Sequence, residues 1–127
     1  MSYPFRTIRT EFWSVDAKVG RAEEDCGEGI VVTDISAGGL QFHAQKQYEK
    51  GDVLCFCLKI IAPFLAKDTE IVIKEMGVIR WSKDDENGHS FGAEFTEITE
   101  FTRSLIMSLI QRTVYVFGDE YMHTMFR

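Results

Sequence analysis

The chain has 127 residues, of which 45% are hydrophobic and 27% charged, the size and composition of one soluble globular domain. Its net charge of −6 at pH 7 excludes binding to DNA or RNA through a broad basic surface. No run of about 18 apolar residues occurs, so we expect no membrane insertion, and the N-terminal residues lack the apolar region of a signal peptide.

Six short strands are expected within the first 98 residues. Apolar and polar residues alternate along most of them, as in strands with one buried face, and the second is a β-branched run. The six segments cover about 12–19, 30–33, 40–45, 53–60, 71–82 and 91–95. Turns separate them at 34–39 and 50–52, and Asn87-Gly88 predicts a tight hairpin. Gly77, inside the fifth segment, predicts a bulge or bend.

After residue 98 the apolar period becomes helical. Apolar side chains recur every three or four residues, which predicts an amphipathic helix ending near Gly118. The stripe consists of Ile98, Phe101, Leu105, Ile106, Leu109 and Ile110. Six strands and one helix predict an antiparallel barrel or sandwich with the helix over one opening or face. We expect a single domain, 1–127, with strands over about 10–98, the helix over about 99–117 and a tail at 118–127.

The stretch from Asp34 to Gly39, Asp-Ile-Ser-Ala-Gly-Gly, is the strongest candidate for a binding element. Asp and Ser side chains bond nearby backbone N–H groups in such turns, and glycines allow positive φ and the close approach of a ligand. A plain connection between two strands is the alternative. Arg6 and Arg9 precede the first predicted strand, and guanidinium groups bind phosphate through two hydrogen bonds and stack on planar bases. A solvated terminus is the alternative for them.

These features together resemble the PilZ domain family. The resemblance rests on the N-terminal arginines, the Asp-x-Ser-x-x-Gly turn that follows them, and the segments Gly77–Trp81 and Phe91–Phe95. It extends over about 3–117 and implies a six-stranded antiparallel β-barrel with a C-terminal amphipathic α-helix. It also implies binding of cyclic di-GMP, a bacterial second messenger. The residues that would bind this ligand are Arg6, Arg9, Asp34, Ser36, Gly38 and Gly39.

One feature departs from the family pattern. The family motif is Arg-x-x-x-Arg, and the position four residues before Arg9 is Phe5 here, with Arg6 one residue late. In an extended segment, a shift of one residue turns a side chain to the opposite side. Two functions therefore remain open. The first is a cytoplasmic bacterial cyclic di-GMP receptor that signals to an unidentified effector protein in motility, adhesion or exopolysaccharide control. The second is a PilZ-fold protein adaptor that binds no nucleotide.

The sequence predicts neither a metal site nor catalysis. Cys55 and Cys57 lie on one face of a predicted strand, but no second pair with zinc-ligand spacing accompanies them, so we expect both thiols to pack against apolar neighbours. No local Ser/His/Asp or Cys/His set indicates an enzyme. The odd number of cysteines, three, favours the reducing cytoplasm.

The tail beyond Gly118 carries a second apolar face. Its members are Tyr121, Met122, Met125 and Phe126. Clusters of aromatic and Met side chains are typical of contact surfaces, which predicts that residues 119–127 dock onto a partner or form a homodimer with a second copy. A tail that folds back on its own barrel, or that frays, is the alternative.

Overall fold

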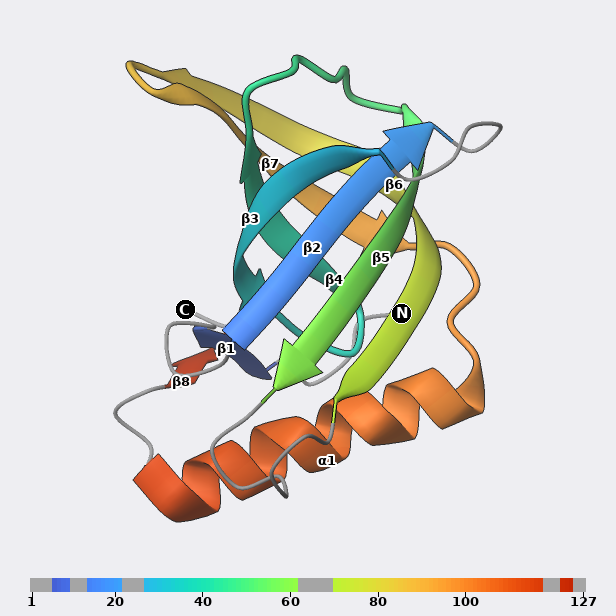
Figure 1. Cartoon of the computed structure of the whole chain (residues 1–127), viewed down its shortest axis with the longest axis vertical. Helices are drawn as coiled ribbons and strands as arrows, with labels where there is room; N and C mark the ends of the chain where they lie inside the picture. Colours follow the sequence, from blue (N-terminus) through green and yellow to red (C-terminus); the bar gives the residue numbers. More distant parts are fainter. Residues whose placement is uncertain (1–5, 10–13, 22–26, 62–69, 118–121, 125–127) are drawn as a thin grey trace.

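The computed structural model describes residues 6–9, 14–21, 27–61, 70–117 and 122–124. Figure 1 shows strands wrapped into a barrel, with one long helix across its lower end. The elements are β1 (Arg6–Arg9), β2 (Ser14–Arg21), β3 (Glu28–Ile35), β4 (Gly39–Ala44), β5 (Val53–Ile61), β6 (Ile71–Asp85), β7 (Gly88–Phe95), α1 (Glu100–Phe117) and β8 (Met122–Thr124).

Six strands close the barrel in the order β2-β5-β6-β7-β4-β3, and a β2–β3 pairing completes the ring. All of these pairings are antiparallel, which confirms the predicted six-stranded barrel. β3 divides between two neighbours, because Ile30 pairs with Ala17 of β2 whereas Asp34 pairs with Arg9 of β1. β1 and β8 therefore extend the sheet beyond the ring, next to the end of β3.

Aromatic side chains from three strands form the centre of the barrel. Phe42 is fully buried, its ring centroid 5.3 Å from that of Phe56 and 5.1 Å from that of Phe91. The helix closes the lower end with buried side chains at Ile106, Leu109 and Ile110. Alternation along each strand and the helical period of α1 direct these side chains inward, as the sequence predicted.

Phe101 does not belong to the buried stripe, contrary to the sequence prediction, because 77% of its surface is exposed. The buried side of α1 runs through Thr102 and Ile106, and each residue of a helix is rotated by about 100° from the one before it. Phe101 therefore lies on the solvent side of Thr102. The helix begins after Thr99, whose hydroxyl accepts a hydrogen bond from the Thr102 N–H at 3.1 Å.

Two further predictions about the strands need correction. The predicted turn at 34–39 is shorter, because β3 continues to Ile35 and β4 begins at Gly39. The predicted bulge at Gly77 is absent: Gly77 pairs regularly with Leu54. A Cβ at Gly77 would lie 3.0 Å from the Phe56 ring, so this glycine makes room for the aromatic centre.

Part of the tail folds back on its own chain. Met122, His123 and Thr124 form β8 and pair with β1 in antiparallel fashion. One edge of β1 is occupied by β3, and its other edge carries backbone groups that β8 satisfies. For residues 122–124 the structure thus shows the alternative to docking on a second copy. Tyr121, Met125 and Phe126 lie outside the described residues.

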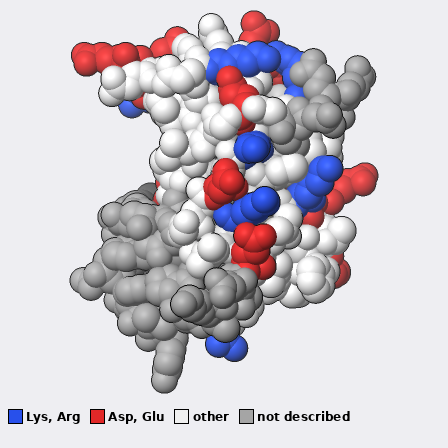
Figure 2. Space-filling view, viewed as in Figure 1, with Lys and Arg blue, Asp and Glu red and all other residues white. Residues whose placement is uncertain are grey.

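Charges of both signs are spread over the side of the barrel formed by β2 and β5. Figure 2 shows basic and acidic side chains interspersed there, so the described residues of this face form no large field of one sign. Among the described residues, no helix has the length and apolar character needed to cross a membrane.

Candidate ligand-binding site

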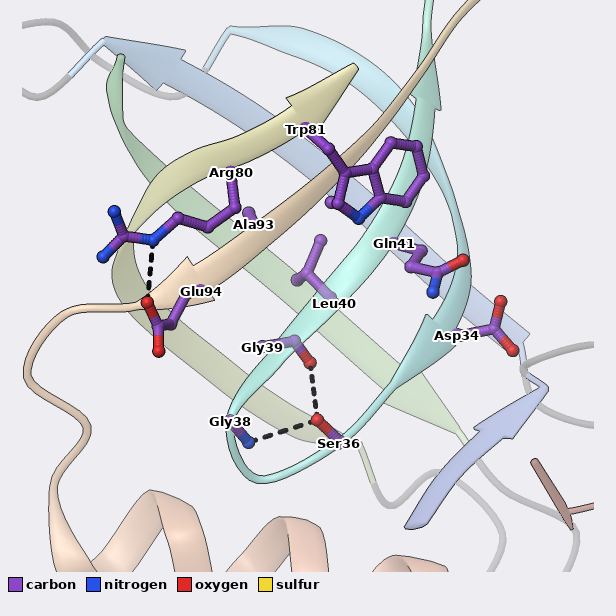
Figure 3. A pocket seen from close by; sticks show the side chains of 11 residues that line it. Asp34, Ser36, Gly38, Gly39, Leu40, Gln41, Arg80, Trp81, Ala93 and Glu94 are labelled. Carbon is purple, nitrogen blue, oxygen red and sulfur yellow. Dashed lines mark hydrogen bonds and ion pairs between the residues drawn. The ribbon is translucent and has the colours of Figure 1, made fainter. Parts of the chain in front are cut away.

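A pocket of about 300 Å³ lies over β3, β4, β6 and β7. It brings together four of the residues that the sequence singled out, namely Asp34, Ser36, Gly38 and Gly39. Three charged or aromatic residues that were not predicted as site residues complete its rim: Arg80, Trp81 and Glu94. Figure 3 shows Asp34 at one end of this group and Arg80 at the other.

Ser36 holds the turn at the base of the pocket. Its side chain is buried, and its N–H donates a hydrogen bond to the Gly39 carbonyl at 2.9 Å. The Ser36 hydroxyl donates to the same carbonyl at 3.3 Å and accepts from the Gly38 N–H at 3.2 Å (Figure 3). The Gly38 carbonyl accepts from the Phe95 N–H at 2.9 Å, which ties the turn to β7. Ser36 therefore shapes the site by holding its backbone.

Gly39 is required by close packing of two strands. A Cβ at this position would lie 2.0 Å from the backbone oxygen of Ala93 in β7. Positive φ was one of the two uses that the sequence suggested for the glycines of this turn, and neither glycine adopts it. Among the described glycines, positive φ occurs at Gly51 and Gly88. The close approach of β4 to β7 is the physical reason for glycine at position 39.

Gly92 makes room for an indole ring. A Cβ at Gly92 would lie 1.9 Å from Nε1 of Trp81, so the indole lies directly against the β7 backbone. Trp81 is 41% exposed, which leaves part of its ring facing solvent in the pocket. A flat aromatic surface of this kind is suited to stacking with a planar base.

A row of cross-strand neighbours crosses the site. Trp81 pairs with Gly92, and Gly92 pairs with Gln41. Gln41 pairs with Asp34, and Asp34 pairs with Arg9. Since neighbouring strands lie about 4.8 Å apart, these five positions span roughly 19 Å. The register thus places Arg9 beside Asp34, at the opposite end of the row from Trp81.

Two β-bulges aim side chains at the pocket. In β6, Ile79 pairs with Ala93 and Trp81 with Gly92, so Arg80 is an extra residue. In β3, a similar irregularity falls between Val32 and Asp34. A bulge interrupts the alternation of a strand, and Arg80 and Trp81 are consecutive yet both exposed. Strict alternation would have turned one of them into the barrel.

Three charged side chains belong to the described lining of the pocket: Asp34, Arg80 and Glu94. Nε of Arg80 donates a hydrogen bond to Oε1 of Glu94 at 2.8 Å, and both side chains are more than half exposed. An ion pair exposed to this degree contributes about 0–1 kcal/mol to stability. The carboxylates outnumber the guanidinium, so an anionic ligand needs additional cations at this site.

The additional cations predicted from the sequence lie on β1. Arg9 occupies the register position opposite Asp34, and Arg6 pairs with Thr124 of β8. Positions three apart on a strand belong to opposite faces. Arg6 and Arg9 are both residues of β1, so the offset noted in the sequence falls within one strand. Among the described residues, no group of three or more His, Cys, Asp or Glu side chains has the arrangement of a metal site.

Sequence reasoning missed Arg80 and Glu94 as site residues. Trp81 and Gly92 entered only as part of the resemblance to a family. The sequence did contain one signal for them: Arg80 and Trp81 are two large, consecutive residues, both of kinds often found on a protein surface, at the end of a strand with alternating apolar residues. Both side chains can face the same pocket only if the strand contains a bulge. A bulge depends on how the strand pairs with its neighbour, which the local sequence does not specify.

The protein resembles known proteins in sequence family and in fold. The PilZ domain family model matches residues 9–112. No curated protein sequence matches the chain. A structure of the Bacillus subtilis inhibitor of motility (MotI/DgrA) is similar to it with a TM-score of 0.66 and 18% identity, over 91% of this chain and 53% of that one. The chain thus spans about half the length of that protein.

A second similar structure is the PilZ domain with c-di-GMP of YcgR from Escherichia coli. Its TM-score is 0.56 at 10% identity, over 91% of this chain and 97% of that one. At 18% and 10% identity, the two structures establish similarity of fold alone. The family model, in contrast, matches most of the sequence. The chain belongs to the PilZ domain family.

Proposed function

We propose that this protein is a cytoplasmic bacterial receptor for cyclic di-GMP that relays the level of this second messenger to an effector protein. The observation that carries the proposal is the single pocket that joins the turn of Asp34, Ser36, Gly38 and Gly39 to the indole of Trp81. Membership of the PilZ family, and the similarity to a PilZ domain with c-di-GMP, support the choice of ligand.

The chemistry of the pocket suits the two parts of such a ligand. Trp81 offers an aromatic face for one guanine, and Asp34 offers a carboxylate that accepts hydrogen bonds from the N–H groups of a guanine edge. Arg9, registered beside Asp34, supplies the charge that a phosphate needs. We assign Arg6 to the same site, as a second cation from β1, on the strength of the family resemblance.

The effector and the process belong to the proposal as well. Motility, adhesion and exopolysaccharide control are the candidates, and the similarity to an inhibitor of motility favours the first. Binding at Arg9 would change the order of β1, and β8 pairs with β1, so β8 is connected to the site through β1. No enzymatic step is proposed.

A PilZ-fold adaptor that binds no nucleotide is the second candidate. One observation favours it: Arg6 and Arg9 stand three positions apart in β1, whereas the two arginines of the family motif stand four positions apart. In this case the surface over Trp81 would contact a protein partner.

Isothermal titration calorimetry with cyclic di-GMP, GTP and cyclic AMP separates the two functions. The receptor binds cyclic di-GMP and neither of the other two. Arg9→Ala then weakens binding by about 10–100-fold, because a hydrogen bond to a charged group contributes roughly 1.5–3 kcal/mol. Arg6→Ala shows whether the offset arginine contributes as much to the binding free energy as Arg9 does. Absence of heat with cyclic di-GMP at high micromolar concentration would refute the receptor and leave the adaptor.

A further inference from the structure

We propose that Arg80, the extra residue of the β6 bulge, is a phosphate-binding residue of this site. It would supply the guanidinium that the β1 motif lacks at position 5. The inference rests on the proposed function, because it concerns how the same pocket holds cyclic di-GMP. It starts from a feature of this chain, an arginine that precedes Trp81 in β6 and whose guanidinium lies beside Glu94, at the opposite end of the pocket from Asp34.

The position of Arg80 follows from strand pairing. Ile79 and Trp81 pair with consecutive residues of β7, so Arg80 is left without a cross-strand partner and shares the outer surface with Trp81. Arg80 and Trp81 line the same pocket, so a ligand with its base on the Trp81 indole would have Arg80 available for its phosphate. A bulge next to a ligand site is a common means of directing a side chain.

The hydrogen bonds of Arg80 leave its phosphate-binding side available. Its Nε donates to Oε1 of Glu94 at 2.8 Å, and among the described residues no other hydrogen bond or ion pair of this guanidinium is found. A guanidinium has five N–H donors, and the four on Nη1 and Nη2 form the fork that binds phosphate. Glu94 therefore holds Arg80 by one edge, and binding a phosphate does not require the ion pair to break.

The charge of the pocket requires this residue. The described lining contains two carboxylates, Asp34 and Glu94, and one cationic side chain, Arg80. Cyclic di-GMP carries two phosphate charges. The β1 arginine in register with Asp34, Arg9, lies at the Asp34 end of the pocket. Without Arg80, the carboxylate of Glu94 would leave the other end of the pocket negative.

Four variants test the inference by calorimetric titration with cyclic di-GMP: Arg80→Ala, Arg80→Lys, Glu94→Gln and Lys83→Ala. We expect Arg80→Ala to weaken binding by about 10–100-fold. Arg80→Lys should fall between Arg80→Ala and wild type, because a lysine keeps the charge and loses the planar fork. Lys83 is an exposed cation three residues along the same strand and outside the pocket lining, so Lys83→Ala should stay within about twofold of wild type.

Glu94→Gln separates a ligand contact from a structural effect of the ion pair. It removes the pair and one carboxylate charge from the pocket and keeps the guanidinium, so affinity should exceed that of wild type. A loss as large as that of Arg80→Ala would overturn the inference. So would wild-type affinity in Arg80→Ala, or equal losses in Arg80→Ala and Lys83→Ala. In those three cases wild type still binds and the proposed function stands; if wild type binds no cyclic di-GMP, both proposals fail.

Discussion

Gly39→Ala is expected to destabilise the barrel strongly, because its new methyl group meets backbone rather than a side chain. The Cβ would lie 2.0 Å from the Ala93 oxygen and 3.1 Å from Cα of Glu94, and neither atom can move by a change of rotamer. β4 and β7 must therefore separate locally. Overpacking of this kind costs about 1–3 kcal/mol.

The separation also weakens hydrogen bonds beside the turn. The Phe95 N–H bonds the Gly38 carbonyl at 2.9 Å, and the Ser36 N–H bonds the Gly39 carbonyl at 2.9 Å. Each such bond contributes about 1 kcal/mol. The free energy of unfolding should therefore fall by about 2–5 kcal/mol, which lowers the melting temperature of a domain of this size by roughly 10 °C or more.

Gly29→Ala is the matched control for thermal melting followed by circular dichroism. Gly29 lies in β3, no atom lies within 4 Å of its Cβ position, and its φ is not positive. The same substitution there should leave the melting temperature unchanged or raise it slightly. If Gly39→Ala and Gly29→Ala have the same melting temperature, the backbone contact at position 39 does not have the destabilising effect predicted for it.

Three further outcomes follow from the same contacts. Gly92→Ala should leave the barrel folded but move the half-exposed Trp81 indole away from β7, seen as a shift of tryptophan emission and a loss of cyclic di-GMP affinity; an unchanged spectrum would contradict the contact. Ile106→Ala, at a fully buried position on α1, should lower the free energy of unfolding in urea by about 2–5 kcal/mol. Phe101→Ala, on the same helix but exposed, should change it by no more than about 0.5 kcal/mol; equal effects would mean that Phe101 is buried after all.

The local pattern of the sequence was sufficient to predict the barrel strands, the helix and the turn between β3 and β4. Alternation reports which residues face a core, and a period of three to four reports a helix, and both depend only on residues near one another in the chain. The segment at 34–39 was recognisable for the same reason, since Asp, Ser and Gly act on backbone within a few residues.

The helix shows where a periodic pattern has limited resolution. Phe101 and Leu105 fit the apolar period as well as Ile106 does, yet Phe101 faces solvent. The rotation of a helix about its axis is set by the surface that it covers, here the open lower end of the barrel. A single aromatic residue at the edge of the stripe can therefore lie on either side.

The site itself was decided by tertiary structure. Trp81, Gly92, Gln41, Asp34 and Arg9 are spread over the chain and form one row because the pairing of five strands makes them successive cross-strand neighbours. Register and bulges result from the packing of whole strands against one another, and no short segment encodes them. The sequence alone therefore indicated the turn residues that we propose as ligand contacts, whereas the fold supplied the aromatic surface, Arg80 and the reason why positions 39 and 92 must be glycine.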